Sequence, residues 1–206
     1  MSVPHYWPRA RRELARRDPV MAGIMRRHRG PALATRGDAF LTLARAIVGQ
    51  QISVRAADAV WGRLVGAAGE ISPACIASLG LAELRSCGLS ARKAEYVADL
   101  AGHFISGALD PGRWRGLDDE TLIAELTDVK GIGRWTAEMF LIFHLTRPDV
   151  FPVADLGLQK AASLHYNRGR KLLPRRLVAL GRSWAPWRSV ATWYLWRSLD
   201  PVPVEY

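Results

Sequence analysis

The 206-residue sequence has little cysteine, since only Cys75 and Cys87 occur. Two cysteines exclude a disulfide framework and a four-cysteine zinc or iron–sulfur site. The five histidines are scattered and show no metal-ligand spacing. No apolar run approaches the roughly 18–20 residues of a membrane-spanning helix, and the N-terminus lacks the apolar core of a secretory signal. We therefore expect a soluble, intracellular protein that has no contact with a membrane.

Negative charge and lysine are also scarce. The sequence has 29 Lys and Arg against 19 Asp and Glu, a formal net charge of +10, and only four of the 29 cations are lysine. An excess of this size favours a polyanionic partner, nucleic acid before a membrane surface. A biased genomic base composition would also enrich arginine. Charge by itself therefore leaves both explanations open.

Signals for β-structure are missing, because neither alternating strand patterns nor Asn-Gly hairpins occur. Helix signals recur instead: Asp38, Ser53, Ser90 and Asp118 each stand as a cap before a segment of helical periodicity. The segment 134–145 is apolar on nearly every side and predicts a buried helix. Hydrophobic residues make up 49% of the chain, enough for one large domain or two small subdomains. The sequence predicts an all-α fold.

The strongest functional signal is the segment 126–137, LTDVKGIGRWTA. One helix is expected to end near Thr127 and the next to begin near Arg134, with Gly131 and Gly133 between them. Glycines so spaced permit a tight hairpin with unobstructed backbone N–H groups, which at a helix N-terminus can hold a phosphate. Such a contact binds the DNA backbone and reads no sequence. A Gly-x-Gly alone is more often an ordinary turn between helices than a phosphate site.

The second signal is Asp155, which follows an extended Phe-Pro-Val segment and begins the helix LGLQKAASL. An isolated Asp at such a position is usually only a helix cap. A helix N-terminus also favours the carboxylate anion. A carboxylate can stabilise the oxocarbenium-like sugar that forms when a glycosidic bond breaks, and it can orient or deprotonate the attacking water.

In combination, the two signals resemble the helix–hairpin–helix DNA glycosylase superfamily, whose catalytic aspartate lies at this spacing after the hairpin. Within it, the run Gly-Ile-Gly-Arg-Trp-Thr-Ala is similar to that of the DNA-3-methyladenine glycosylase II family, and the resemblance spans roughly residues 39–199. The best-known bacterial form of that family carries an extra N-terminal β-rich domain that this chain is too short to hold. We therefore expect a compact version of the family.

The resemblance implies two helical subdomains that flank a DNA-binding cleft. One would span about residues 38–145 and contain the hairpin 126–137; the other would combine about residues 1–37 and 146–206. The implied partner is double-stranded DNA containing damaged bases, bound by a monomer. The implied location is the cytoplasm, associated with the nucleoid, in a bacterium, and the nucleus in a eukaryote.

The resemblance also implies the site residues. Asp155 would be catalytic, and Trp135 stands where bifunctional members carry a Schiff-base lysine, so the enzyme would be monofunctional. The base pocket would contain Trp135, Met139 and Trp196. The residues implied to bind DNA are Gln51, which would fill the gap left by the flipped base, together with Gly131, Gly133, Arg134 and Thr136. The carbonyls of Thr127, Val129 and Ile132 could hold a sodium or potassium ion, and no other cofactor is implied.

The expected function is release of alkylated purines, of the 3-methyladenine and 7-methylguanine type, leaving an abasic site for base excision repair. A neutral purine normally needs an acid to leave, and no second carboxylic acid is placed by motif beside Asp155. A cationic alkylpurine already carries its charge, which tryptophan rings attract. The alternatives are a glycosylase for oxidised guanine or mispaired adenine, and a non-catalytic DNA-binding module. Phosphate binding alone gives no reason for Asp155 at this spacing, which argues against the module.

Overall fold

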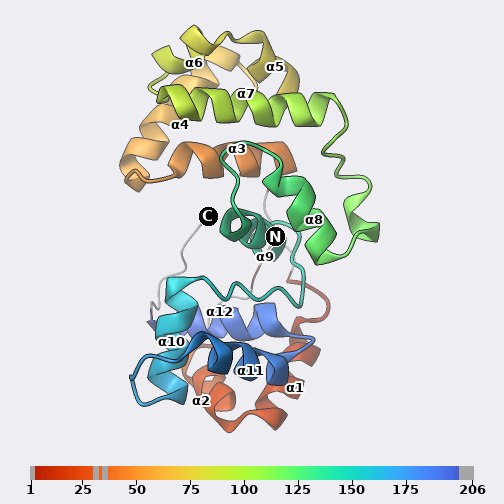
Figure 1. Cartoon of the computed structure of the whole chain (residues 1–206), viewed down its shortest axis with the longest axis vertical. Helices are drawn as coiled ribbons and strands as arrows, with labels where there is room; N and C mark the ends of the chain where they lie inside the picture. The colour runs from red at the N-terminus through yellow and green to blue at the C-terminus, as the bar shows by residue number, and fades with distance from the viewer. Residues whose placement is uncertain (1–2, 30–32, 34–36, 200–206) are drawn as a thin grey trace. The chain divides into compact units, whose positions relative to one another are not determined.

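Figure 1 shows the computed structural model of the chain, which describes residues 3–29, 33 and 37–199. Over these residues the regular elements are twelve α-helices and one short 3-10 helix, without a strand. The predicted all-α fold class is therefore confirmed. None of the described helices combines the length and the apolar character needed to cross a membrane.

The chain forms two compact units. Unit 1 combines residues 1–35 with residues 141–206, and unit 2 comprises residues 36–140. The subdomains expected from the sequence include stretches outside the described residues, namely 1–2, 30–32, 34–36 and 200–206. The helix α9 (Arg134–Phe143) begins in unit 2 and ends in unit 1.

Unit 2 is organised around α7 (Ala91–Ile105), which contacts α3, α5 and α6 (Figure 1). Phe40, Phe104, Trp114 and Phe140 form its aromatic core, a chain of edge-to-face contacts with ring centroids 5.3–6.2 Å apart. Besides α7 and the start of α9, its helices are α3 (Ala39–Gly49), α4 (Val54–Ala68), α5 (Pro73–Ser78), α6 (Leu81–Ser86), the 3-10 helix η1 (Trp114–Gly116) and α8 (Asp119–Thr127).

Unit 1 is organised around α12 (Arg188–Leu199), which contacts the other four helices of the unit. The four helices around α12 are α1 (Trp7–Arg17), α2 (Pro19–Arg27), α10 (Leu156–Tyr166) and α11 (Pro174–Trp184). The Asp18 carboxylate connects three of these four helices, α2, α10 and α11. It accepts the Met21 N–H at 2.9 Å, the Tyr166 hydroxyl at 2.7 Å and the Trp184 indole N–H at 3.0 Å.

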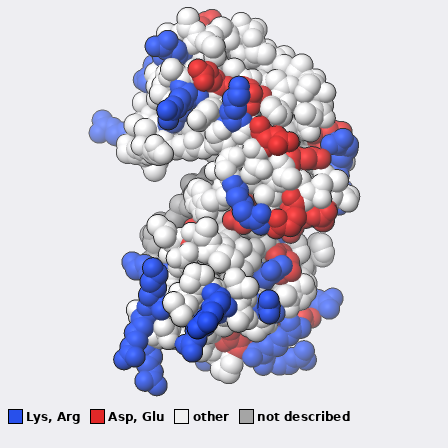
Figure 2. Space-filling model, in the orientation of Figure 1, with Lys and Arg blue, Asp and Glu red and all other residues white. Residues whose placement is uncertain are grey.

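The basic charge of the chain is concentrated in unit 1. Its sequence contains 18 of the 29 Lys and Arg but only 6 of the 19 Asp and Glu, a formal net charge of +12. The remaining 11 cations and 13 acids give unit 2 a net charge of −2. Figure 2 shows this difference on one face, where Lys and Arg gather over unit 1 and acidic side chains over unit 2. The net charge of the whole chain conceals this segregation.

Candidate active site

Asp155 is the N-cap of α10. Its Oδ1 accepts the backbone N–H of Leu158 at 2.6 Å and the indole N–H of Trp196 at 2.7 Å. The residues before it form a turn, in which the Asp155 N–H donates to the Pro152 carbonyl at 2.9 Å. The half-buried carboxylate is therefore held in one orientation by donors from two helices.

Trp196 comes from α12 and stacks on Phe143, with ring centroids 5.6 Å apart and planes inclined by 11°. A Cβ at Gly157 would lie 3.2 Å from both the indole Cδ1 and the carboxylate Oδ1, which would crowd both groups. The glycine therefore lets the indole approach Asp155. The sequence indicates an aromatic pocket residue at position 196, but it gives no sign of this hydrogen bond, because its partners lie 41 residues apart.

The hairpin between α8 and α9 uses its two glycines differently. Gly131 has a φ of +84°, and a Cβ there would collide with the ring of Tyr96. A Cβ at Gly133 would meet nothing within 4 Å, and the Gly133 carbonyl accepts the first helical N–H of α9, from Ala137, at 3.0 Å. Gly131 is therefore required by its backbone conformation and by Tyr96, whereas the backbone at Gly133 faces open space. DNA binding at either glycine stays a prediction.

Arg134, expected to bind DNA, pairs with two carboxylates. Its Nη1 and Nη2 donate to Glu120 at 2.8 and 2.6 Å, and its Nε donates to Glu138 at 3.1 Å. The hydrogen bonds to Glu120 are the main cause of the raised pKa of Arg134, and the nearby charges of Glu120 and Glu138 add to it. The guanidinium is thus oriented by acids of α8 and α9 at the start of the helix.

The other expected site residues of α9 differ in exposure. Trp135 is 41% exposed and Thr136 is half-buried, whereas Met139 is buried, with 5% exposed. The structure brings Asp155 and Trp196 together within unit 1, while Trp135 and Met139 lie in the part of α9 that belongs to unit 2.

Gln51 lies in the loop between α3 and α4 and is exposed, with a φ of +57°. Only a few per cent of residues other than glycine adopt a positive φ, so this backbone conformation is unusual. The neighbours Ile52 and Val54 are 40% and 79% exposed, so the loop presents apolar surface around Gln51. Gln51 is predicted from the sequence, but the residues that hold its loop, Gln50 and Lys93, are not, because their partners are distant in the sequence.

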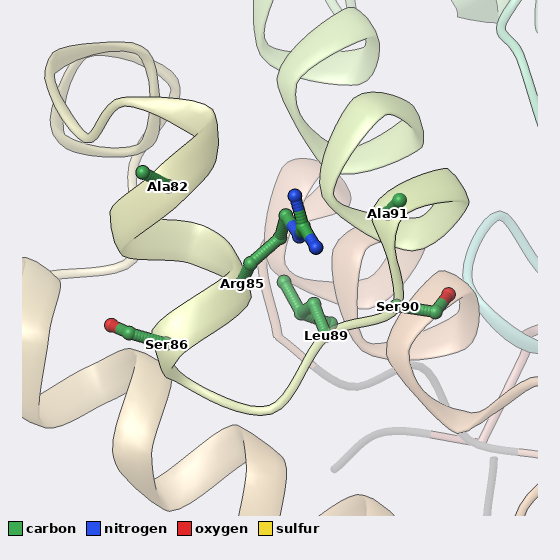
Figure 3. A pocket seen from close by; sticks show the side chains of 6 residues that line it. All are labelled: Ala82, Arg85, Ser86, Leu89, Ser90 and Ala91. Carbon is green, nitrogen blue, oxygen red and sulfur yellow. The ribbon is translucent and has the colours of Figure 1, made fainter.

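A separate hollow of about 470 Å³ lies between α6 and the start of α7 (Figure 3). The Arg85 side chain extends from α6 toward α7 in this view. None of the site residues expected from the sequence lines it; its walls are Ala82, Arg85, Ser86, Leu89, Ser90 and Ala91. In the part of the chain that the structure describes, His, Cys, Asp and Glu side chains form no cluster of three that could hold a metal ion.

Comparison with known proteins identifies a family over most of the chain. Residues 44–186 match the HhH-GPD superfamily, described as base excision DNA repair proteins. DNA-3-methyladenine glycosylase 1 of Schizosaccharomyces pombe is 37% identical over 163 residues, which cover 76% of this chain and 70% of the relative. The chain spans 66–70% of the length of this and three further curated relatives whose names include DNA-3-methyladenine glycosylase.

Solved structures support the same family. The DNA-3-methyladenine glycosidase of Bacillus halodurans is 37% identical, with a TM-score of 0.85 and coverage of 91% of this chain and 87% of that one. The S. pombe 3-methyladenine DNA glycosylase in complex with abasic DNA is 30% identical, with a TM-score of 0.77 and coverage of 95% and 100%. Relatives of this fold therefore include a structure bound to DNA.

Proposed function

The chain belongs to the HhH-GPD superfamily of base excision DNA repair proteins, and from this premise we propose that it is a monofunctional DNA glycosylase for alkylated purines. It flips a base of the 3-methyladenine or 7-methylguanine type out of duplex DNA, hydrolyses the N-glycosidic bond and leaves an abasic site. The observation that carries the proposal is the Asp155 carboxylate, held at the N-terminus of α10 by Leu158 and Trp196. The names of its relatives support the same substrate class.

In the proposed mechanism, Asp155 acts on the sugar. As the bond to the base breaks, positive charge develops on C1′ and the ring oxygen, and a nearby carboxylate stabilises that charge. The same carboxylate orients the attacking water and accepts a proton from it. The two hydrogen bonds to Oδ1 fix the carboxylate before the reaction begins, so little reorganisation is needed as the charge develops.

The proposed substrate leaves without an acid. A purine alkylated at N3 or N7 is cationic and departs as a neutral base, whereas an unmodified purine requires protonation. Trp135 and Trp196 supply electron-rich rings, each well-placed cation–π contact contributing about 0.5–2 kcal/mol. Selection among lesions then follows the charge of the base more than its shape.

The proposal assigns no covalent step to the protein. Trp135 occupies the position at which bifunctional members carry an amine nucleophile, and an indole cannot form a Schiff base. Borohydride should therefore trap no protein–DNA adduct on a methylated duplex. A strong adduct that depends on the lesion would assign the chemistry to one of the four lysines instead.

DNA binding is assigned to the hairpin and the Gln51 loop. The open surface at Gly133 admits a phosphate at the N-terminus of α9, where backbone N–H groups and the helix dipole favour an anion. Gln51 fills the space left by the flipped nucleotide and offsets part of the lost stacking.

A monovalent cation at the carbonyls of Thr127, Val129 and Ile132 would add positive charge beside the phosphate at the hairpin. The Val129 carbonyl accepts one hydrogen bond, from Ile132 at 3.1 Å, and its second lone pair fits a cation ligand.

The direct test is incubation of the protein with methylated duplex DNA, followed by chromatographic identification of the released bases. The proposal predicts 3-methyladenine and 7-methylguanine in solution and an unbroken DNA strand that alkali then cleaves. Matched duplexes with a single hypoxanthine should react far more slowly, because hypoxanthine is neutral. Equal release of hypoxanthine would contradict selection by charge, and binding without release of any base would favour the non-catalytic module.

A further inference from the structure

Two loops of unit 2 are proposed to meet DNA, and both are attached to one face of α7. The loops are residues 49–53, which carry Gln51, and the hairpin residues 128–133. Lys93, Tyr96 and Asp99 follow one another at intervals of three residues, a spacing that keeps neighbouring side chains on nearly the same side of a helix. We call these three half-buried residues the α7 strip.

Lys93 holds the loop that carries Gln51. Its Nζ donates to the Val48 carbonyl at 2.8 Å and to the Gln50 carbonyl at 2.6 Å. Both carbonyls lie at the C-terminal end of α3, where backbone acceptors have no partner within the helix and where a cation is favoured by the dipole. The two bonds fix the chain immediately before Gln51, which then takes its positive φ.

The rest of the strip holds the hairpin. The Tyr96 ring lies directly against Gly131, and Asp99 Oδ2 accepts the Lys130 N–H at 2.9 Å. The Gln50 side chain closes the connection, because its Nε2 donates to the Gly131 carbonyl at 2.8 Å. The bond between Gln50 and Gly131 joins residues that lie 81 positions apart in the sequence.

We propose that the α7 strip holds the Gln51 loop and the hairpin as one rigid platform, and that Lys93 is the positioning residue through which Gln51 reaches the gap left by a flipped base. This inference rests on the proposed function. It goes beyond that function in assigning a role in base flipping to a side chain that need not touch DNA.

The chemistry of Lys93 supports this role over simple packing. Burial lowers the pKa of its ammonium, so the charge is held at a cost that an apolar side chain would avoid. An apolar residue would fill the same space but would leave two carbonyls without their donor. The directional hydrogen bonds of the ammonium define the conformation of the loop. An apolar side chain that only filled the space would not define it.

The test is a double-mutant cycle in the full chain between Lys93→Met and Gln51→Ala, with Lys171→Met as the control that removes an exposed lysine. The readout is the single-turnover rate of 3-methyladenine release from duplex and from single-stranded DNA. Lys93→Met should lower the duplex rate by about tenfold, as loss of charged hydrogen bonds does, and leave the single-strand rate within about threefold. In the Gln51→Ala background its effect on the duplex rate should shrink to less than about threefold, because the two residues act through one interaction.

Equal losses from Lys93→Met in both backgrounds, or on both DNA forms, would overturn the inference. If Lys93→Met does not fold, Gln50→Met replaces it in the same cycle, because Gln50→Met removes only the bond to Gly131.

Hydrogen exchange of the unbound protein gives a readout that does not depend on activity. Exchange should accelerate in both 49–53 and 128–133 in Lys93→Met but not in Lys171→Met, and acceleration in 49–53 alone would overturn the platform. A wild-type protein that releases no base would contradict the proposed function, and the exchange result would still decide whether the α7 strip holds the two loops as one platform.

Discussion

At the scale of single residues, one oxygen atom of Asp155 accepts hydrogen bonds from two helices. Oδ1 caps α10 through Leu158 and also accepts the indole N–H of Trp196. The capping role is predictable from sequence, because it depends on an N–H only three residues away. The bond from Trp196 is not predictable, since it depends on the packing of α10 against α12. The catalytic role of Asp155 and the pocket role of Trp196 stay predictions.

Replacing Trp196 with Phe tests whether this bond matters. Phe can keep the stacking on Phe143 but cannot donate to Asp155. A hydrogen bond to a charged group contributes about 1.5–3 kcal/mol, so the rate of base release should fall about tenfold or more. Trp193→Phe is the matched control, because this buried residue of the same helix packs edge-on against Trp7 and Phe143. The measurement is the single-turnover rate with enzyme in excess, and a Trp196→Phe rate equal to that of wild type would remove Trp196 from the positioning of Asp155.

At the scale of elements, helix starts are well predicted and contacts between helices are not. Asp38, Ser53, Ser90 and Asp118 each accept the N–H three residues further along, as their place in the sequence indicates. These interactions are local and need no knowledge of the fold. The connections from α7 to the Gln51 loop and the hairpin join distant segments, so a single sequence holds no signal of them.

The hairpin glycines give a prediction that separates folding from binding. Gly131→Ala should destabilise the protein by about 1–3 kcal/mol, because alanine is strained at a positive φ and its Cβ would collide with Tyr96. Gly133→Leu should leave stability nearly unchanged, since the site is open, but it should weaken duplex binding for all sequences alike.

The measurements for the hairpin are denaturant unfolding and the salt dependence of duplex binding. Each lost phosphate contact should reduce the slope of log K against log salt by about 0.9. Gly62→Leu in α4 is the control, since a Cβ there also meets nothing within 4 Å. A Gly133→Leu variant that binds like Gly62→Leu would place the phosphate contact elsewhere.

At the scale of the whole molecule, composition predicts a basic protein but not where the charge lies. Unit 1 carries a net charge of +12 and unit 2 a net charge of −2. The division into units depends on which helices pack together, so the segregation becomes visible only with the structure. The hairpin and the Gln51 loop belong to the nearly neutral unit, so the DNA contacts proposed for them would depend on backbone N–H groups and a polar side chain rather than on a dense basic surface.

Glu13 gives a pH prediction for the stability of unit 1. Hydrogen bonds from Arg9 and from the Trp187 indole lower its pKa from 4.5 to about 2, with Arg17 adding to the effect. Because the folded pKa is lowered, the stabilising contribution is present above the unfolded pKa and is lost as pH falls from 4.5 toward 2. The denaturant midpoint of wild type should therefore fall through this window, and that of Glu13→Gln should fall less. A variant whose midpoint declines as steeply as that of wild type would show that Glu13 contributes little.

The most direct test of the whole account is the single-turnover release of 3-methyladenine by wild type and by Asp155→Asn. Asn caps a helix about as well as Asp, so the melting temperature and the affinity for a methylated duplex should stay close to those of wild type. The negative charge is lost, so the rate of release should fall by about 100-fold or more. A folded, DNA-binding Asp155→Asn protein that releases the base at nearly the wild-type rate would contradict the account.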